Sequence, residues 1–254
     1  MLDEGTRVYL TGRVAIESPH GRVDQGKFPG RQGRLAFAQL ALRDAPVPRS
    51  ELIELLWAGE PPSSADTALS AIISRLRTLL RDAGLPRGIL VSALGCYELR
   101  LAPGTWIDVR AAAQAVHDAE AALQAGDARV AYGPASVAYH IARRPFLPGE
   151  DGSWVDEQRT HLLALLSRAT ECLAMVSLNN GEPGIAVALA EELLGRDPFR
   201  EIGYQILMRA HLAAGSRAEA LRAYERCRLL LAEELGADPS PETQALHLQV
   251  LTGS

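Results

Sequence analysis

The feature that most constrains this chain is a repeat of 34 residues in its C-terminal half. The matching pairs are Gly181 and Gly215, Ala186 and Ala220, Val187 and Leu221, and Leu193 and Cys227. This period is typical of helix-turn-helix tetratricopeptide repeats, in which small residues let paired helices approach and larger residues fill the space between them. The larger residues here are Tyr204, Leu207, Leu212 and Tyr224. We therefore predict an all-α repeat domain, with another kind of antiparallel helical bundle as the alternative.

The segment 217–242 indicates how this array ends. Apolar residues recur near the helical period as far as Leu231. Gly236 is a typical residue for ending a helix, and the prolines at 239 and 241 oppose its continuation. We predict that this helix is the last of the array.

The N-terminal half alternates short strands with helices. The predicted elements are strands within residues 7–28 with a turn at Pro19-His20-Gly21, a short helix over 31–43, a helix with Ser50 as its N-cap, a longer helix from Ser64 or Asp66 to Asp82, and a hairpin over 89–101 that turns at Leu94-Gly95. Gly84 supplies the stop for the longer helix. Strands, three helices and a closing hairpin predict a winged helix-turn-helix, with the longer helix in the recognition position.

The helix over 64–82 has one apolar face and one polar face. The residues predicted to face a core, at helical spacing, are Leu69, Ile73, Leu76 and Leu80. The candidates for direct DNA contact are Thr67, Ser70, Ser74, Arg75 and Arg77. The candidates for phosphate contact are Arg31, Arg34, Arg49 and Arg81. For each of these side chains, a solvated or intramolecularly paired group is the alternative.

Length and charge divide the chain into two parts. A chain of 254 residues fits about two domains, which we place at 1–105 and 106–254. The first part carries 13 Arg and Lys against 11 Asp and Glu, and the second carries 13 against 20, so their net charges are +2 and −7. We expect a mainly α protein with a small β part, whose two domains have different partners.

No residue pattern predicts an enzyme, a metal site, a cofactor site or a membrane protein. The six histidines lack the spacing of a zinc site, and no nucleophile elbow or paired-carboxylate signature is present. The three cysteines are widely spaced in apolar patterns, which predicts core thiols. No apolar run approaches the ~20 residues of a membrane span, and Met1-Leu2-Asp3-Glu4 is acidic where a secretion signal is basic. We therefore expect a cytoplasmic protein without catalytic residues.

Several longer motifs resemble a known family of regulators. The run DTALSAIISRLRTLL, followed by a hairpin that ends in Tyr97, resembles the OmpR-type winged helix. The segments WIDVRAAAQAV from Trp106, FLPGEDGSWVDEQRTHLLAL from Phe146 and LAEELGADPSPE near the end are similar to the bacterial transcriptional activator domain. In this order the chain resembles the Streptomyces antibiotic regulatory proteins.

This resemblance implies a function and a set of partners. It implies a sequence-specific activator that binds repeated elements of double-stranded promoter DNA and recruits RNA polymerase holoenzyme, in the regulation of a secondary-metabolite gene cluster. A homodimer or a partner regulator is a possible further partner, and no membrane is involved.

Two positions depart from the family pattern. The recognition helix begins with Asp66-Thr67-Ala68 instead of a basic stretch, and the hairpin tip Ala93-Leu94-Gly95 lacks the arginine that often enters the minor groove. Asp66 favours the helix dipole but repels a nearby phosphate. These departures motivate an alternative function: a protein-binding or ligand-sensing regulatory module whose winged helix has weak or lost DNA affinity and which acts through a partner regulator.

Overall fold

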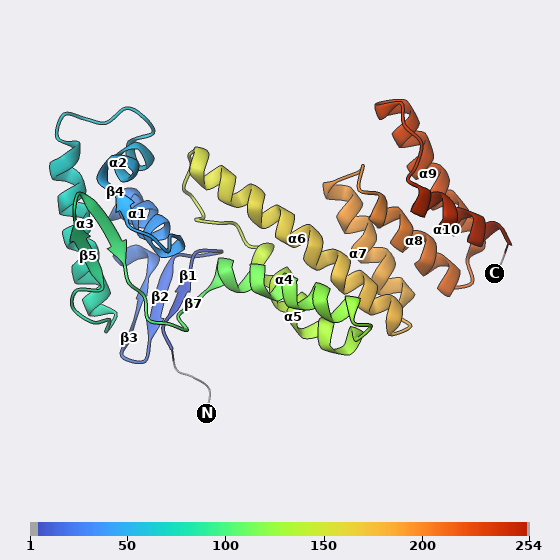
Figure 1. Cartoon of the computed structure of the whole chain (residues 1–254), viewed down its shortest axis with the longest axis horizontal. Helices are drawn as coiled ribbons and strands as arrows, with labels where there is room; N and C mark the ends of the chain where they lie inside the picture. Colours follow the sequence, from blue (N-terminus) through green and yellow to red (C-terminus); the bar gives the residue numbers. More distant parts are fainter. Residues whose placement is uncertain (1–4, 253–254) are drawn as a thin grey trace. The chain divides into compact units, whose positions relative to one another are not determined.

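The computed structural model describes residues 5–252 and separates by its internal contacts into two compact units. Unit 1 holds residues 5–112 and 141–163, and unit 2 holds residues 113–140 and 164–252. The fold is mainly α with a small β part near the N-terminus, as predicted (Figure 1). The predicted domain boundary between residues 105 and 106 stays a prediction.

The strands of unit 1 form two small sheets. The first has the order β3-β2-β1-β7 and is antiparallel except for the parallel pair β1 and β7. Its strands are β1 (Arg7–Tyr9), β2 (Ala15–Ser18), β3 (Gly21–Asp24) and β7 (Trp106–Ile107). The second sheet has the antiparallel order β4-β6-β5, with strands β4 (Val47–Pro48), β5 (Leu90–Ala93) and β6 (Cys96–Leu99).

Three helices of unit 1 follow the short 3-10 turn η1 (Gln25–Lys27), and β4 lies between the first and the second of them in the sequence. They are α1 (Gly30–Leu42), α2 (Arg49–Trp57) and α3 (Ala65–Asp82), and each contacts the other two. Their apolar faces supply the core, which includes the fully buried Leu35, Phe37, Leu52, Leu56, Leu69, Ile73, Leu76 and Leu80. The prediction that Ser50 caps α2 is wrong, because the helix already begins at Arg49 and Pro48 occupies the N-cap without a side-chain bond. Proline is well suited to such a start because its φ is preset and it has no amide to leave unpaired.

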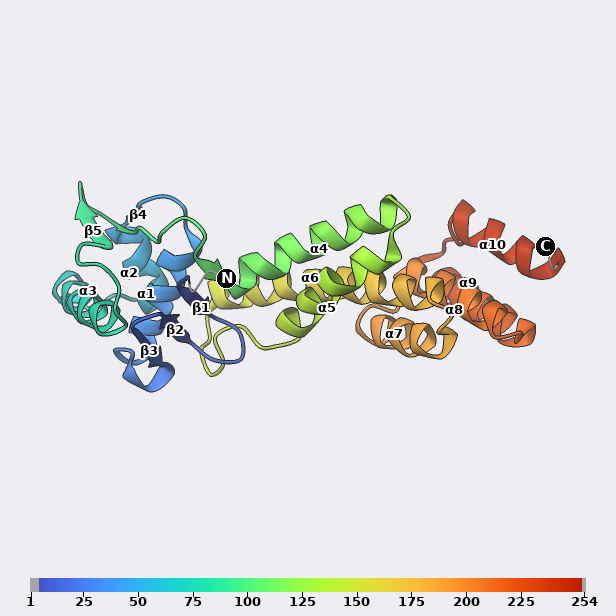
Figure 2. The same cartoon turned by 90° about the horizontal axis from the view of Figure 1, so that it is seen from below.

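The hairpin of β5 and β6 confirms the predicted turn. Its two turn residues, Leu94 and Gly95, have φ of 49° and 74°. Two successive left-handed residues make the tight turn whose twist matches that of the flanking strands. Figure 2 shows the hairpin tip standing clear of the helices of unit 1.

A buried carboxylate fastens the start of α4 (Asp108–Gln124) to the first sheet. Asp108 is fully buried, and its Oδ2 accepts hydrogen bonds of 2.8–2.9 Å from the amides of Leu10 and Thr11 and from the Thr11 hydroxyl. Burial raises the pKa of Asp108 above its usual value, although these donors oppose the shift. Further along, an isolated bridge pairs Thr11 with Phe146, and Phe146 packs edge-on against Trp154 with ring centroids 5.6 Å apart.

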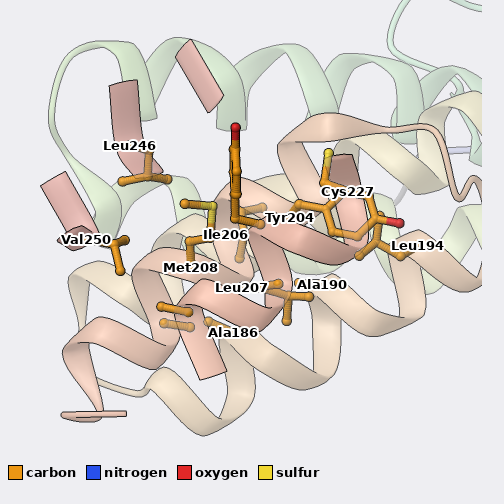
Figure 3. Packing of buried hydrophobic residues seen from close by; sticks show 14 of the residues in the cluster. Ala186, Ala190, Leu194, Tyr204, Ile206, Leu207, Met208, Cys227, Leu246 and Val250 are labelled. Atoms are coloured by element: carbon orange, nitrogen blue, oxygen red, sulfur yellow. The ribbon is translucent and has the colours of Figure 1, made fainter. Parts of the chain in front are cut away.

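The remaining helices contribute to unit 2 and carry the repeat. Their bounds are α5 (Ala128–Ala142), α6 (Ser153–Asn179), α7 (Pro183–Arg196), α8 (Glu201–Ala213), α9 (Arg217–Leu235) and α10 (Pro241–Thr252). Helices α7 and α9 begin 34 residues apart, each after a left-handed glycine, Gly181 or Gly215. Ala186 and Ala220, which the repeat pairs, are both fully buried. Figure 3 shows how side chains of α7 to α10 gather into one apolar cluster.

The prediction that the helix over 217–235 ends the array is wrong, because α10 follows it. Pro241 begins this helix and does not block it. Leu246 and Val250 are buried in the cluster with Met208 of α8 (Figure 3). Glu201 of α8 accepts hydrogen bonds from the Ser240 amide, the Ser240 hydroxyl and the Thr243 hydroxyl, at 2.6–2.8 Å. Burial alone would raise the pKa of Glu201, but these donors together hold it below its usual value.

The structure bears on two composition-based expectations. Helix α6 is long and apolar enough to cross a membrane by length and composition, and 56% of its most apolar stretch is buried inside the protein. Cys96 is only half-buried, whereas Cys172 and Cys227 are buried as predicted, and none of the three forms a disulfide. Burial raises the pKa of Cys172 to about 12 and that of Cys227 to about 11, so both thiols are protonated near neutrality.

Candidate nucleic-acid interface

The polar face of α3 is open to solvent along its whole length. The candidate contacts on this face are all exposed: Thr67, Ser70, Ser74, Arg75, Arg77 and Arg81. Within residues 5–252, Arg75 forms no hydrogen bond or ion pair. An unpaired guanidinium presents its full fork of donors, which matches the acceptors O6 and N7 of guanine in a major groove.

The first turn of α3 is held by Arg49. The Arg49 guanidinium donates to the Asp66 carboxylate at 2.9 Å and to the Tyr97 hydroxyl, and it lies 5.4 Å from the centroid of the Tyr97 ring. It also reaches the Ser70 hydroxyl at 3.3 Å, while that hydroxyl donates to the Asp66 carbonyl. Arg49 therefore links the start of α2 to α3 and β6, and it compensates the charge of Asp66 that would otherwise repel a phosphate.

Farther along α3, the arginines are less engaged. The Nε of Arg77 donates to the carbonyl of Leu90 at 3.1 Å, which fixes the side chain between α3 and β5. The only ion-pair partner that the described residues offer Arg81 is its neighbour Asp82, at 3.7 Å between exposed groups. Exposed pairs of this kind contribute little, so Arg81 can exchange this partner for another anion.

Arg31 and Arg34 lie elsewhere, around Glu150. Arg34 donates to Oε1 of Glu150 at 2.5 Å, and Nε of Arg31 is 3.5 Å from Oε2. Arg31 also donates to the carbonyl of Asp151 at 2.6 Å. The Glu150 side chain is 1% exposed and Arg34 is 19% exposed, so this is a largely buried pair whose charges depend on each other. The structure thus brings Thr67, Ser70, Ser74, Arg75, Arg77 and Arg81 onto one helix face and gives Arg31, Arg34 and Arg49 internal partners.

The hairpin tip carries no charge. Leu94 is fully exposed, and the strand ends beside it hold Ser92, Ala93 and Cys96. A tip of this composition supplies apolar contact but no counter-charge for DNA.

One basic residue near α3 was absent from the sequence-based candidates. Arg87 is exposed in the loop between α3 and β5, and it lines the same cavity as Arg77 and Arg81. In the sequence, Arg87 is a single arginine after Pro86, and only the folding of the loop against α3 brings it near the other two.

Among residues 5–252, no group of three His, Cys, Asp or Glu side chains could hold a metal ion. In unit 2, carboxylates lie beside arginines, as where Arg168 donates to Glu120 at 2.6–2.7 Å. This hydrogen bond holds the pKa of Glu120 below its usual value.

Comparison with known proteins points to transcription. The family model of the bacterial transcriptional activator domain matches residues 107–251. The regulatory protein AfsR of Streptomyces coelicolor is 36% identical over 87% of this chain, and the transcriptional regulatory protein EmbR of Mycobacterium tuberculosis is 32% identical over 86%. This chain spans only 22% of AfsR and 57% of EmbR.

A solved structure of one of these relatives has the same fold as this chain. Mycobacterium tuberculosis EmbR, in complex with a low-affinity phosphopeptide, superposes with a TM-score of 0.86 at 28% identity, over 99% of this chain and 66% of that one. The winged-helix and helical-repeat fold is therefore confirmed, and the relatives named above are a regulatory protein and a transcriptional regulatory protein. Since the family model matches more than half of its residues, the chain belongs to the bacterial transcriptional activator domain family and is of the Streptomyces antibiotic regulatory protein type.

Proposed function

We propose that this chain is a cytoplasmic, sequence-specific activator that reads promoter DNA with α3. The observation that carries the proposal is the face of α3, where Arg75 is exposed and unpaired while the opposite face is buried in the core of unit 1. A helix fixed in this way presents base-reading side chains without having to reorganise. We assign Ser74 and Arg75 to base edges. Thr67, Ser70 and Arg77 lie on the same exposed side of α3 and would contact DNA beside them.

The proposal includes the partners that the resemblance implies. Two copies of the chain, or one copy beside a partner regulator, would bind repeated promoter elements and gain affinity by simultaneous engagement. The bound protein would recruit RNA polymerase holoenzyme to a secondary-metabolite gene cluster. The names of the relatives as regulators support this proposal by analogy, and the exposed face of α3 supports it on the structure itself.

The test is binding of the purified chain to the DNA upstream of its own gene. Fluorescence anisotropy would compare this duplex with a scrambled duplex of the same composition, for wild type and Arg75→Ala. We expect a preference for the upstream duplex that Arg75→Ala removes, because a bidentate arginine contributes about 1–3 kcal/mol of discrimination. Equal binding of both duplexes by wild type would contradict the proposal.

The alternative function is favoured by a specific observation. Asp66 places a carboxylate at the start of α3, 77% exposed, and Leu94 leaves the hairpin tip uncharged. A regulatory module that acts through a partner regulator would show both features. In that case wild type would bind the upstream duplex only when the partner is added, and Arg75→Ala would change nothing in the absence of the partner.

A further inference from the structure

A small cavity lies at the C-terminal end of α3, where the loop to β5 turns back against the helix. Its volume is about 390 Å³. One wall is a stripe of α3 that includes Ser74, Arg77 and Arg81, and the other is the loop with Arg87 and Gly88. Residues 74, 77 and 81 follow the i, i+3, i+7 spacing of one helix face. We call Arg77, Arg81 and Arg87 the arginine cradle.

The cradle has an excess of positive charge. None of the described residues that line it carries a carboxylate, while three guanidinium groups do line it. Among the described residues, the only ion pair of a cradle arginine joins Arg81 to Asp82 at 3.7 Å, outside the lining, and the C-terminal dipole of α3 adds a further partial negative charge. That dipole is equivalent to roughly half a negative charge. Three full positive charges exceed both, so the cavity attracts an anion.

The cradle is also preorganised to receive an anion from solvent. The hydrogen bond from Nε of Arg77 to Leu90 fixes one guanidinium and leaves its terminal nitrogens for another partner. Within residues 5–252, Arg87 forms no hydrogen bond or ion pair. Gly88 has φ of 84°, and a Cβ built there would meet no atom within 4 Å, so the loop backbone is open to a ligand. Guanidinium forks match the tetrahedral oxygens of phosphate.

We infer that the arginine cradle binds one phosphate of the DNA backbone beside the groove that α3 reads. This inference rests on the proposed function and adds to it a defined phosphate site with a residue, Arg87, outside the recognition helix. DNA is the favoured source of the phosphate because Ser74 belongs both to the cradle wall and to the exposed face of α3 that carries Arg75. A duplex on that face therefore brings its backbone to the cradle. A single phosphate held here fixes the register of α3 without reading sequence.

The test measures the salt dependence of DNA binding in four variants. They are Arg81→Ala, Arg87→Ala, the double variant, and Arg13→Ala as control. Arg13 is an exposed arginine of the same unit, on the bend between β1 and β2, and it lies outside the cradle. Anisotropy titrations with the upstream and scrambled duplexes, at about 50–300 mM salt, give the slope of log K against log salt. Circular dichroism would check that each variant is folded.

We expect each cradle variant to lower the slope by about one, equally for both duplexes, while Arg13→Ala matches wild type. Because both arginines hold one phosphate, the double variant should lose little more than either single variant, which is a non-additive result. Slopes equal to that of Arg13→Ala would overturn the cradle even if Arg75→Ala still removes sequence preference. If the cradle variants lower the slope while wild type binds both duplexes equally, the cradle would be supported and the proposed function would be refuted.

Free phosphate is the remaining occupant to distinguish. Inorganic phosphate would be titrated into wild type and Arg87→Ala and followed by NMR shifts of the arginine side chains. Saturation of wild type alone, together with an unchanged DNA slope in Arg87→Ala, would mean that the cavity is a site for a small anion, and it would overturn the inference. Absence of DNA binding by wild type would refute the cradle and the proposed function together.

Discussion

Two sets of arginines in unit 1 have opposite surroundings. Arg31 and Arg34 share the buried Glu150, whereas Arg75 and Arg87 have no partner among the described residues. The first set is paired with a carboxylate inside the protein, where removal of an arginine leaves the charge of Glu150 less compensated. The second set leaves its charge exposed to solvent. The comparison teaches that the basic residues of a winged-helix domain have to be sorted by their internal partners before any of them is proposed to contact DNA.

The largest expected effect on stability comes from breaking the buried ion pair of Arg34 and Glu150. Arg34→Ala removes the closest partner of Glu150, whose carboxylate is 1% exposed. We expect the free energy of unfolding to fall by about 3 kcal/mol, because the buried carboxylate loses its closest partner and keeps only the longer contact with Arg31, at 3.5 Å. Urea denaturation measures this loss. Adding Glu150→Gln should restore part of it, and a loss below about 0.5 kcal/mol would show that the pair is not structural.

The matching change at an exposed, unpaired arginine should leave stability unchanged. Arg75→Ala removes an exposed, unpaired side chain, so we expect unfolding within about 0.5 kcal/mol of wild type. Its preference for the upstream duplex should fall by about 1–3 kcal/mol, which is at least several-fold in affinity. Parallel urea titrations and anisotropy would measure both quantities. A destabilised variant would place Arg75 with the structural arginines.

A smaller effect is expected when the carboxylate partner of Arg49 is removed. Asp66→Asn removes the carboxylate that Arg49 holds at 2.9 Å. Because this pair is partly exposed, the cost in stability should stay below about 1 kcal/mol. Affinity for both duplexes should rise, and the salt slope should steepen by about one as Arg49 becomes available to phosphate. An unchanged slope would mean that Arg49 does not approach DNA.

The smallest effect should come from the hairpin tip. Leu94→Arg places a cation on a fully exposed residue and keeps the left-handed turn with a side chain of similar strain. If the tip approaches the minor groove, both duplexes should bind a few-fold more tightly, with a slope steeper by about one. Leu94→Gln, which adds no charge, is the matched control. Equal slopes for the two variants would show that the hairpin stays away from DNA.

Periodic features were predictable from sequence because burial imposes them. The spacing of Leu69, Ile73, Leu76 and Leu80 predicts the buried face of α3, and all four side chains are buried. The turn at Leu94-Gly95 follows equally from local chemistry, because glycine tolerates the left-handed backbone.

Partners distant in the sequence were not predictable. Nothing near Arg34 reveals that its partner is 116 residues away, and nothing near Arg87 reveals that its loop folds against α3. Helix α10 was missed because a proline was interpreted as a stop, although the same residue suits the first position of a helix. The contacts of α3 with DNA stay predictions, since they depend on a molecule outside the fold.

The buried Asp108 has a consequence for how this protein can be dissected. Its carboxylate satisfies the amides of Leu10 and Thr11, and strand β7 just before it pairs in parallel with β1. A fragment that ends at residue 105 would lose β7, and it would leave these two amides without their acceptor. Residues 106–108 therefore complete the first sheet, and a minimal winged-helix fragment has to extend past Asp108 to keep that sheet intact.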